Sequence, residues 1–84
     1  MLRVRYFAWL RQRVGRAEEE VDPPADITTV RALATWLAAR HPRFGEALAE
    51  PGLVRFAVNK AYVAEDAAIR PGDEVAFFPP VTGG

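Results

Sequence analysis

The chain has 84 residues, enough for one domain, and its eleven basic residues balance eleven acidic ones, which argues against a nucleic-acid-binding role. It has no cysteine, which excludes disulfides, thiolate metal sites and a cysteine nucleophile on this chain. Arg3 and Arg5 make the N-terminus too polar for a signal peptide, and no apolar run approaches the roughly 20 residues of a membrane span, so we expect a cytoplasmic protein without a membrane partner.

The N-terminal quarter predicts two strands joined by a short helix. Leu2, Val4 and Tyr6 alternate with Arg3, Arg5 and Phe7, with the period of two that is typical of a strand. Residues 8–14 can form a short helix that Gly15 ends. Residues 17–21 are polar and predict an exposed second strand, after which Asp22-Pro23-Pro24 breaks regular structure.

The main helix of the chain follows. Thr28 or Thr29 can cap it, because a hydroxyl can accept a hydrogen bond from the first turn. Pro42 ends it, and residues 44–50 predict a second short helix that Pro51-Gly52 closes. The apolar stripe of the main helix has 3.6-residue spacing and consists of Val30, Leu33, Ala34, Leu37 and His41.

The C-terminal part predicts further strands. Residues 54–58 alternate as a third strand, and Asn59-Lys60 is typical of a tight turn into a short strand around Tyr62-Val63. Arg70-Pro71-Gly72-Asp73 is a strong turn signal. Glu74 to Phe78 then form the last strand.

This element order predicts an α+β fold in which one main helix packs across one face of a mixed sheet. That is the β-grasp, or ubiquitin-like, arrangement. We expect a domain over residues 1–78 and a flexible tail over residues 79–84, because Pro79-Pro80 cannot donate ladder hydrogen bonds and ends the last strand.

Side-chain catalysis finds little support in this sequence. There is one histidine and no serine, so no hydrolase triad can be built. We expect His41 to be structural, at the end of the main helix, where the helix dipole favours a positive charge. Glu18-Glu19-Glu20 could suggest a metal site, but neighbouring strand residues point to opposite faces. We therefore expect a solvated edge strand and no metal.

The C-terminal tail is the remaining candidate for chemistry. It ends in Gly83-Gly84, which could be a frayed terminus. However, a glycine carboxylate has no neighbouring Cβ, so such an end can thread a narrow slot. Pro79-Pro80 stiffens its base and lowers the cost of ordering it on docking. Phe78 shares its face with Glu74, and we therefore expect Phe78 to be exposed as part of a protein-binding patch.

Residues 73–84 resemble the C-terminal signature of the small, sulfur-carrier subunit of molybdopterin synthase, the MoaD family. The Val4–Gly15 opening, the Thr29–Leu33 helix start and Ala57-Val58-Asn59 resemble the same family, so that the likeness covers the whole chain.

The resemblance implies a sulfur carrier that is not an enzyme by itself. Gly84 would be adenylylated by a ubiquitin-activating-like adenylyltransferase that consumes ATP, with no cofactor bound to this chain, and then converted to a thiocarboxylate. The tail would enter the large synthase subunit and deliver sulfur to cyclic pyranopterin monophosphate, usually within a heterotetramer of two small and two large subunits. The residues expected to contact the partners are Phe78, Pro79, Pro80, Val81, Thr82 and Gly83.

Three alternatives stay open. A sulfur carrier of the thiamine or tRNA thiolation pathway would share the Gly-Gly end, although the thiamine carrier usually lacks the Phe77-Phe78-Pro79-Pro80 run. A ubiquitin-like modifier would join Gly84 to a lysine. A plain β-grasp binding module would have an inert tail, and deletion of Gly83-Gly84 would leave its function intact.

Overall fold

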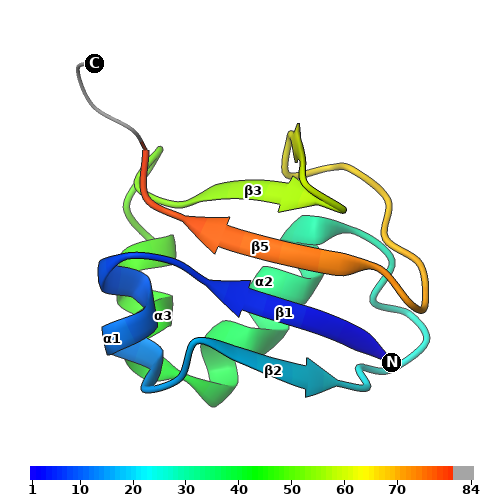
Figure 1. Ribbon diagram of the computed structural model, residues 1–84, viewed down its shortest axis with the longest axis horizontal. Helices are drawn as coiled ribbons and strands as arrows, with labels where there is room; N and C mark the ends of the chain where they lie inside the picture. The colour runs from blue at the N-terminus through cyan, green and yellow to red at the C-terminus, as the bar shows by residue number, and fades with distance from the viewer. Residues whose placement is uncertain (81–84) are drawn as a thin grey trace.

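The computed structural model describes residues 1–80, which form one five-stranded mixed sheet and three helices (Figure 1). Sheet order is β2-β1-β5-β3-β4; β1 and β5 are parallel, and the other neighbours are antiparallel. The strands are β1 (Leu2–Tyr6), β2 (Glu18–Val21), β3 (Arg55–Val58), β4 (Ala61–Val63) and β5 (Glu74–Phe78). The helices are α1 (Trp9–Val14), α2 (Val30–Arg40) and α3 (Pro42–Leu48).

The central strands β1 and β5 set the two faces of the sheet. Val4 lies opposite Val75, and Tyr6 lies opposite Phe77; all four side chains are buried against the helices. Side chains at alternate positions point to the other, open face because strand residues alternate. The first and last strands therefore lie side by side beneath α2, which confirms the predicted β-grasp fold.

The main helix α2 begins directly after a threonine N-cap, as the sequence predicts. Of the two candidates, Thr29 is the cap: its Oγ1 accepts a hydrogen bond from the Ala32 amide at 3.1 Å. Val30, Leu33 and Leu37 are fully buried, as the helical stripe predicts. His41 is the C-cap of α2, and Pro42 directly starts α3.

An aromatic cluster fills the core at the end of the sheet where β5 finishes. The ring of Phe77 lies 5.2 Å from that of Phe44 on α3 and 5.8 Å from that of Phe56 on β3, measured between centroids. Tyr6 contacts both Phe44 and Phe77, with centroids 5.6 and 6.0 Å away. Such edge-to-face pairs add to the stabilisation from burial alone. The base of the tail is therefore anchored to the most densely aromatic part of the core.

The β3–β4 hairpin turns on two residues with left-handed backbones. Asn59 has φ 50° and Lys60 has φ 70°, as a two-residue turn between twisted strands requires. Asn59 also ties the hairpin to the start of β5, because its Oδ1 accepts from the Glu74 amide and its Nδ2 donates to Asp73, each at 3.0 Å. The expected tight turn is confirmed.

The expectation for the second strand is partly wrong. Strand β2 was predicted to be exposed, but its burial alternates, and Glu19 and Val21 point into the molecule. Although β2 is an edge strand, its inner face packs over α2 and α3, so alternate positions are covered even where the sequence is polar. Because residue 19 is a glutamate, the sequence of β2 does not show the alternation of apolar and polar residues that would predict a buried face.

Candidate functional site at the tail-bearing end of the sheet

The last strand carries the candidate site to one end of the sheet. In β5, Phe78 pairs with Arg55 of β3, and this is the last pair of that ladder. Pro79 and Pro80 follow and are partly buried, and neither has an amide hydrogen to extend the ladder. The other predicted site residues, Val81, Thr82, Gly83 and Gly84, lie outside the described residues.

Phe78 lies on the open face of the sheet, as predicted, and it is partly buried rather than fully exposed. Its ring centroid lies 5.4 Å from that of Tyr62 on β4, and Tyr62 is 81% exposed. Between them in the sheet, Ala57 pairs with both Tyr62 and Ala76, so small side chains form the floor of this region. We call Phe78, Tyr62, Ala76 and Ala57 the apolar patch.

Tyr62 was not predicted as a site residue. The sequence places it on a short strand after a tight turn, but it does not say that β3 pairs with β5, the pairing that brings Phe78 close to Tyr62. A single exposed aromatic is ordinary, whereas two aromatic rings in contact on one open face are a feature of binding surfaces. The signal that could have identified it is the hairpin at Asn59-Lys60, which places Tyr62 opposite Ala57.

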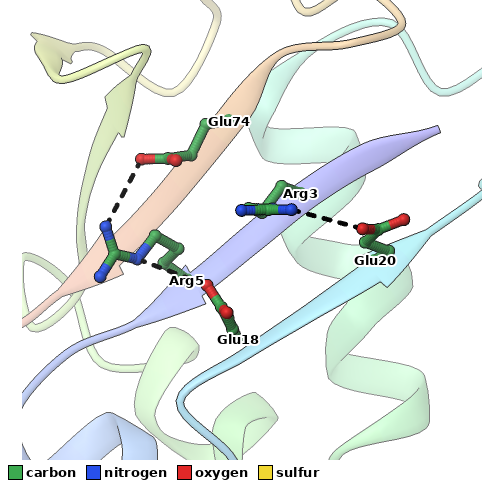
Figure 2. Close-up of polar contacts among 5 residues, drawn as sticks. All are labelled: Arg3, Arg5, Glu18, Glu20 and Glu74. Carbon is green, nitrogen blue, oxygen red and sulfur yellow. Dashed lines mark hydrogen bonds and ion pairs between the residues drawn. The ribbon is translucent and has the colours of Figure 1, made fainter.

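The other half of the open face is charged (Figure 2). Arg5 of β1 reaches Glu18 of β2 at 3.9 Å and Glu74 of β5 at 3.8 Å, and Arg3 reaches Glu20 at 3.4 Å. These exposed pairs contribute little to stability individually. They do neutralise the β1–β2 half of the face, so the apolar patch is bounded on one side by paired charges.

A buried polar cluster lies beneath the sheet at the same end. The Tyr6 hydroxyl donates to Glu19 Oε2 at 2.7 Å, and His41 Nε2 lies 2.8 Å from the same oxygen. Arg16 approaches the other carboxylate oxygen at 3.6 Å. The side chain of Glu19 is only 5% exposed, which corrects the expectation that residues 18–20 are all solvated. Buried carboxylates need such partners because desolvation is otherwise costly.

The ionisation of this cluster follows from its contacts. Burial acts to raise the pKa of Glu19, but the hydrogen bonds from Tyr6 and His41 and the nearby positive charges outweigh it and hold the pKa below the ordinary value. Burial and the neighbouring carboxylate raise the pKa of Tyr6 well above its ordinary value. The cluster therefore joins β1, β2 and the end of α2, and His41 is structural, although its main partner is Glu19 rather than the helix dipole.

Other kinds of site find no support in the described part of the chain. Within residues 1–80, no three histidine, aspartate or glutamate side chains are grouped so that they could hold a metal ion. Over the same residues, no helix is long and apolar enough to cross a bilayer. The site geometry thus consists of a strand end, a proline-stiffened exit and the apolar patch.

Comparison with known proteins identifies the family. Residues 4–84 match the ThiS family. The molybdopterin synthase sulfur carrier subunit of Escherichia coli (strain K12) is 48% identical over 84 residues, with both chains covered completely. The chain belongs to this family of sulfur carriers.

Solved structures of related proteins agree with this fold. A putative molybdopterin converting factor subunit 1 from Pyrococcus furiosus has a TM-score of 0.81 at 39% identity, covering 95% of this chain and 97% of that one. The small archaeal modifier protein 1 of Haloferax volcanii has a TM-score of 0.80 at 28% identity, with the same coverage. Sulfur carriers and protein modifiers thus share this scaffold, and the full-length sequence identity to the synthase subunit favours the sulfur carrier.

Membership of the sulfur-carrier family relates the tail-bearing end of the sheet to a function. The family function is that of a small, non-catalytic sulfur-carrier subunit. A carrier of this kind needs a rigid folded domain, a reactive terminus that can extend away from that domain, and a surface that partners recognise. The aromatic core beneath β5 supplies the rigid body, and Pro79-Pro80 marks the point where the sheet ladder stops.

Proposed function

We propose that the chain carries sulfur as a thiocarboxylate on Gly84 and donates it to cyclic pyranopterin monophosphate bound in the large subunit of molybdopterin synthase. The observation that carries the proposal is the position of the tail: β5 ends beside the apolar patch, with two prolines directly after the last ladder pair. The full-length identity to a molybdopterin synthase sulfur carrier subunit supports the choice of pathway.

The chemistry requires activation, because a carboxylate is a poor electrophile. Attack of the Gly84 carboxylate on the α-phosphorus of ATP forms an acyl-adenylate and releases pyrophosphate. A sulfur donor then forms the carbon–sulfur bond, and AMP leaves. A ubiquitin-activating-like adenylyltransferase would supply the ATP site, since this sequence has no phosphate-binding glycine loop. Because the step consumes ATP, we place it in the cytoplasm.

The large subunit would bind the carrier through the apolar patch and the tail. Phe78 and the adjoining Pro79 and Pro80 are partly buried on the isolated chain, so docking can remove further apolar surface from water. Val81, Thr82 and Gly83 would line the tail channel, and Gly83 would keep the arm thin. Two transfers complete one dithiolene, which fits a heterotetramer with two small and two large subunits.

Intact mass spectrometry tests the carrier chemistry. The chain is incubated with ATP, the activating enzyme and a sulfur source, and we expect a mass gain equal to the exchange of one oxygen for sulfur. A variant lacking Gly83-Gly84 should show no gain, and its free energy of unfolding should match the wild type because the buried core of the described chain is built from residues between Leu2 and Phe77. No gain in the wild type, with an activating enzyme shown to be competent on another carrier, would contradict the proposal.

The acceptor separates the proposed role from the thiamine, tRNA and modifier alternatives. The thiocarboxylated chain is mixed with the large subunit and cyclic pyranopterin monophosphate, and molybdopterin is measured. We expect product to form in proportion to the thiocarboxylate consumed. Covalent joining of Gly84 to lysines without molybdopterin formation would instead assign the chain to protein modification, the role that the name of the Haloferax neighbour describes.

A further inference from the structure

Arginines gather at the tail-bearing end of the molecule although the whole chain has no net charge. Strand β1 runs parallel to β5, so α1, which follows β1, lies at the end where the tail leaves (Figure 1). Five of the arginines lie at or next to this end: Arg11 and Arg13 in α1, Arg16 after it, Arg40 in the last turn of α2 and Arg43 in the first turn of α3.

Two of these arginines line a surface hollow beside the base of the tail. The hollow has a volume of about 520 Å³, and its lining consists of Trp9, Gln12, Arg13, Arg43 and Leu53. Leu53 lies two residues before Arg55, the partner of Phe78, and thus at the end of the sheet where the tail begins. The hollow and the tail therefore open at the same end of the molecule.

Contacts within the chain hold the guanidinium group of Arg13 in place. Its Cζ lies 4.9 Å from the centre of the Trp9 ring, and its Nη1 donates to the carbonyl oxygen of Arg43 at 3.4 Å. Stacking on an aromatic ring leaves the in-plane N–H donors of a guanidinium available. A partner carboxylate could therefore bind Arg13 with little further ordering.

The position of Arg43 is not one that stabilises the fold. It lies in the first turn of α3, where the helix dipole disfavours a cation. Among residues 1–80, no carboxylate lies within 4.0 Å of the Arg13 or Arg43 guanidinium, whereas Arg3 and Arg5 on the open face each reach a glutamate (Figure 2). The hollow is thus lined by two arginines that have no ion-pair partner among residues 1–80.

We propose that this hollow is an electropositive docking site for an acidic segment of the large synthase subunit, at the rim of the channel that receives the tail. The inference rests on the proposed function and adds a second contact to it, beyond the apolar patch. A guanidinium group can bind a carboxylate through two parallel hydrogen bonds, and Trp9 and Leu53 offer an apolar lining that suits a protein side chain.

A protein partner fits the hollow better than a nucleic acid does. A polyanion needs an extended basic surface, whereas here the cations flank one hollow and the chain has no net charge. At the opposite end, Asp22 follows β2 and Asp73 precedes β5, and both would repel a long polyanion. Opposite charges at the two ends would instead orient the carrier so that the tail faces an acidic rim first.

The test is the association rate of the full-length chain with the large subunit, measured by stopped flow over a range of salt concentrations. Arg43→Glu should slow association about tenfold at low salt, and the difference should shrink as salt rises. Arg70→Glu is the matched control with the same charge change at the opposite end, and it should alter the rate less than about twofold. If Arg43→Glu or Arg70→Glu disturbs folding, the double variant Arg13→Gln and Arg43→Gln repeats the test by removing the two positive charges without adding negative ones.

The outcomes separate the two proposals. Equal rates for Arg43→Glu and Arg70→Glu, with normal binding of the wild type, would overturn the docking site alone. Failure of the wild type to bind the large subunit would overturn the proposed function and the docking site with it. Binding of a tRNA probe in fluorescence anisotropy, lost in Arg43→Glu, would assign the arginines to nucleic acid and overturn a protein-docking role.

Discussion

At the scale of single residues, the buried carboxylate of Glu19 connects the first two strands with the end of the main helix. It accepts from Tyr6 in the first strand and contacts His41 at the end of the main helix, at 2.7 and 2.8 Å. Arg16 neutralises its second oxygen. Hydrogen bonds to a charged group are stronger than those between neutral groups, and leaving such a group unpaired is costly.

The lowered pKa of Glu19 makes stability depend on pH. Since its pKa is lower in the folded protein than in the unfolded chain, the carboxylate stabilises the fold above its unfolded pKa of about 4.3, and this contribution is lost as pH falls through the folded pKa. Glu19→Gln should therefore lower the free energy of unfolding by about 2 kcal/mol at pH 7 and flatten its fall below pH 5. Urea denaturation between pH 3 and pH 7 measures both effects.

The matched control is Glu18→Gln, which changes an exposed neighbour on the same strand. It should leave the free energy of unfolding at pH 7 within about 0.5 kcal/mol of the wild type. If the two variants lose the same stability, the buried cluster does not stabilise the fold as its geometry implies.

At the scale of elements, the β3–β4 hairpin determines where Tyr62 lies, and its turn is strained. Lys60 has φ 70°, which places its Cβ close to backbone oxygen and costs roughly 1–2 kcal/mol for a residue other than glycine. Asn59 tolerates its own left-handed conformation better and secures the turn to β5. The hydrogen bonds of Asn59 thus hold the turn in a conformation that is unfavourable for the backbone of Lys60.

Replacing Lys60 by glycine should raise the free energy of unfolding by about 1 kcal/mol, because glycine adopts a positive φ without the Cβ clash. Lys60→Ala is the control, since it removes the same side chain but keeps the Cβ. It should not stabilise the protein. Thermal unfolding of both variants decides the matter, and equal midpoints would show that the turn carries no strain at this position.

At the scale of the whole molecule, the β-grasp topology divides the work of the carrier. The helices cover one face of the sheet. The other face has a charged half, which Figure 2 shows, and the apolar patch. The parallel pairing of β1 with β5 brings the N-terminal helix to the end where the tail leaves. The proposed docking surfaces therefore lie at the same end of the body as Pro79 and Pro80, where the described chain ends.

Phe78→Ala should raise the dissociation constant for the large subunit about 30-fold, since truncating an aromatic anchor costs about 2 kcal/mol. Tyr62→Ala should weaken binding in the same direction because the two rings are in contact. Isothermal titration calorimetry gives both constants. Trp36→Ala, on the helix side of the molecule, is the control, and an equal loss in that variant would show that the apolar patch is not the docking surface.

The sequence alone predicted every strand and helix to within a few residues. Alternation marked β1 and β5, the Thr29 cap and the apolar stripe marked α2, and prolines marked the ends of α2 and β5. These signals are local: they depend on side-chain period, hydrogen-bonding capacity and backbone restriction within a few residues. The end of β5 before Pro79 is confirmed, whereas the tail over residues 79–84 stays a prediction from its prolines and glycines.

The contacts between distant segments were decided only by the tertiary structure. Glu19 was predicted to be solvated because residues 17–21 are polar and were expected to form an exposed edge strand. Its burial depends on Tyr6 and His41, which lie 13 and 22 residues away. Tyr62 joined the site only when β4 paired with β3 beside β5. Such contacts depend on the three-dimensional path of the chain, and local sequence patterns carry no information about which distant residue will supply a hydrogen-bond partner or a stacking ring.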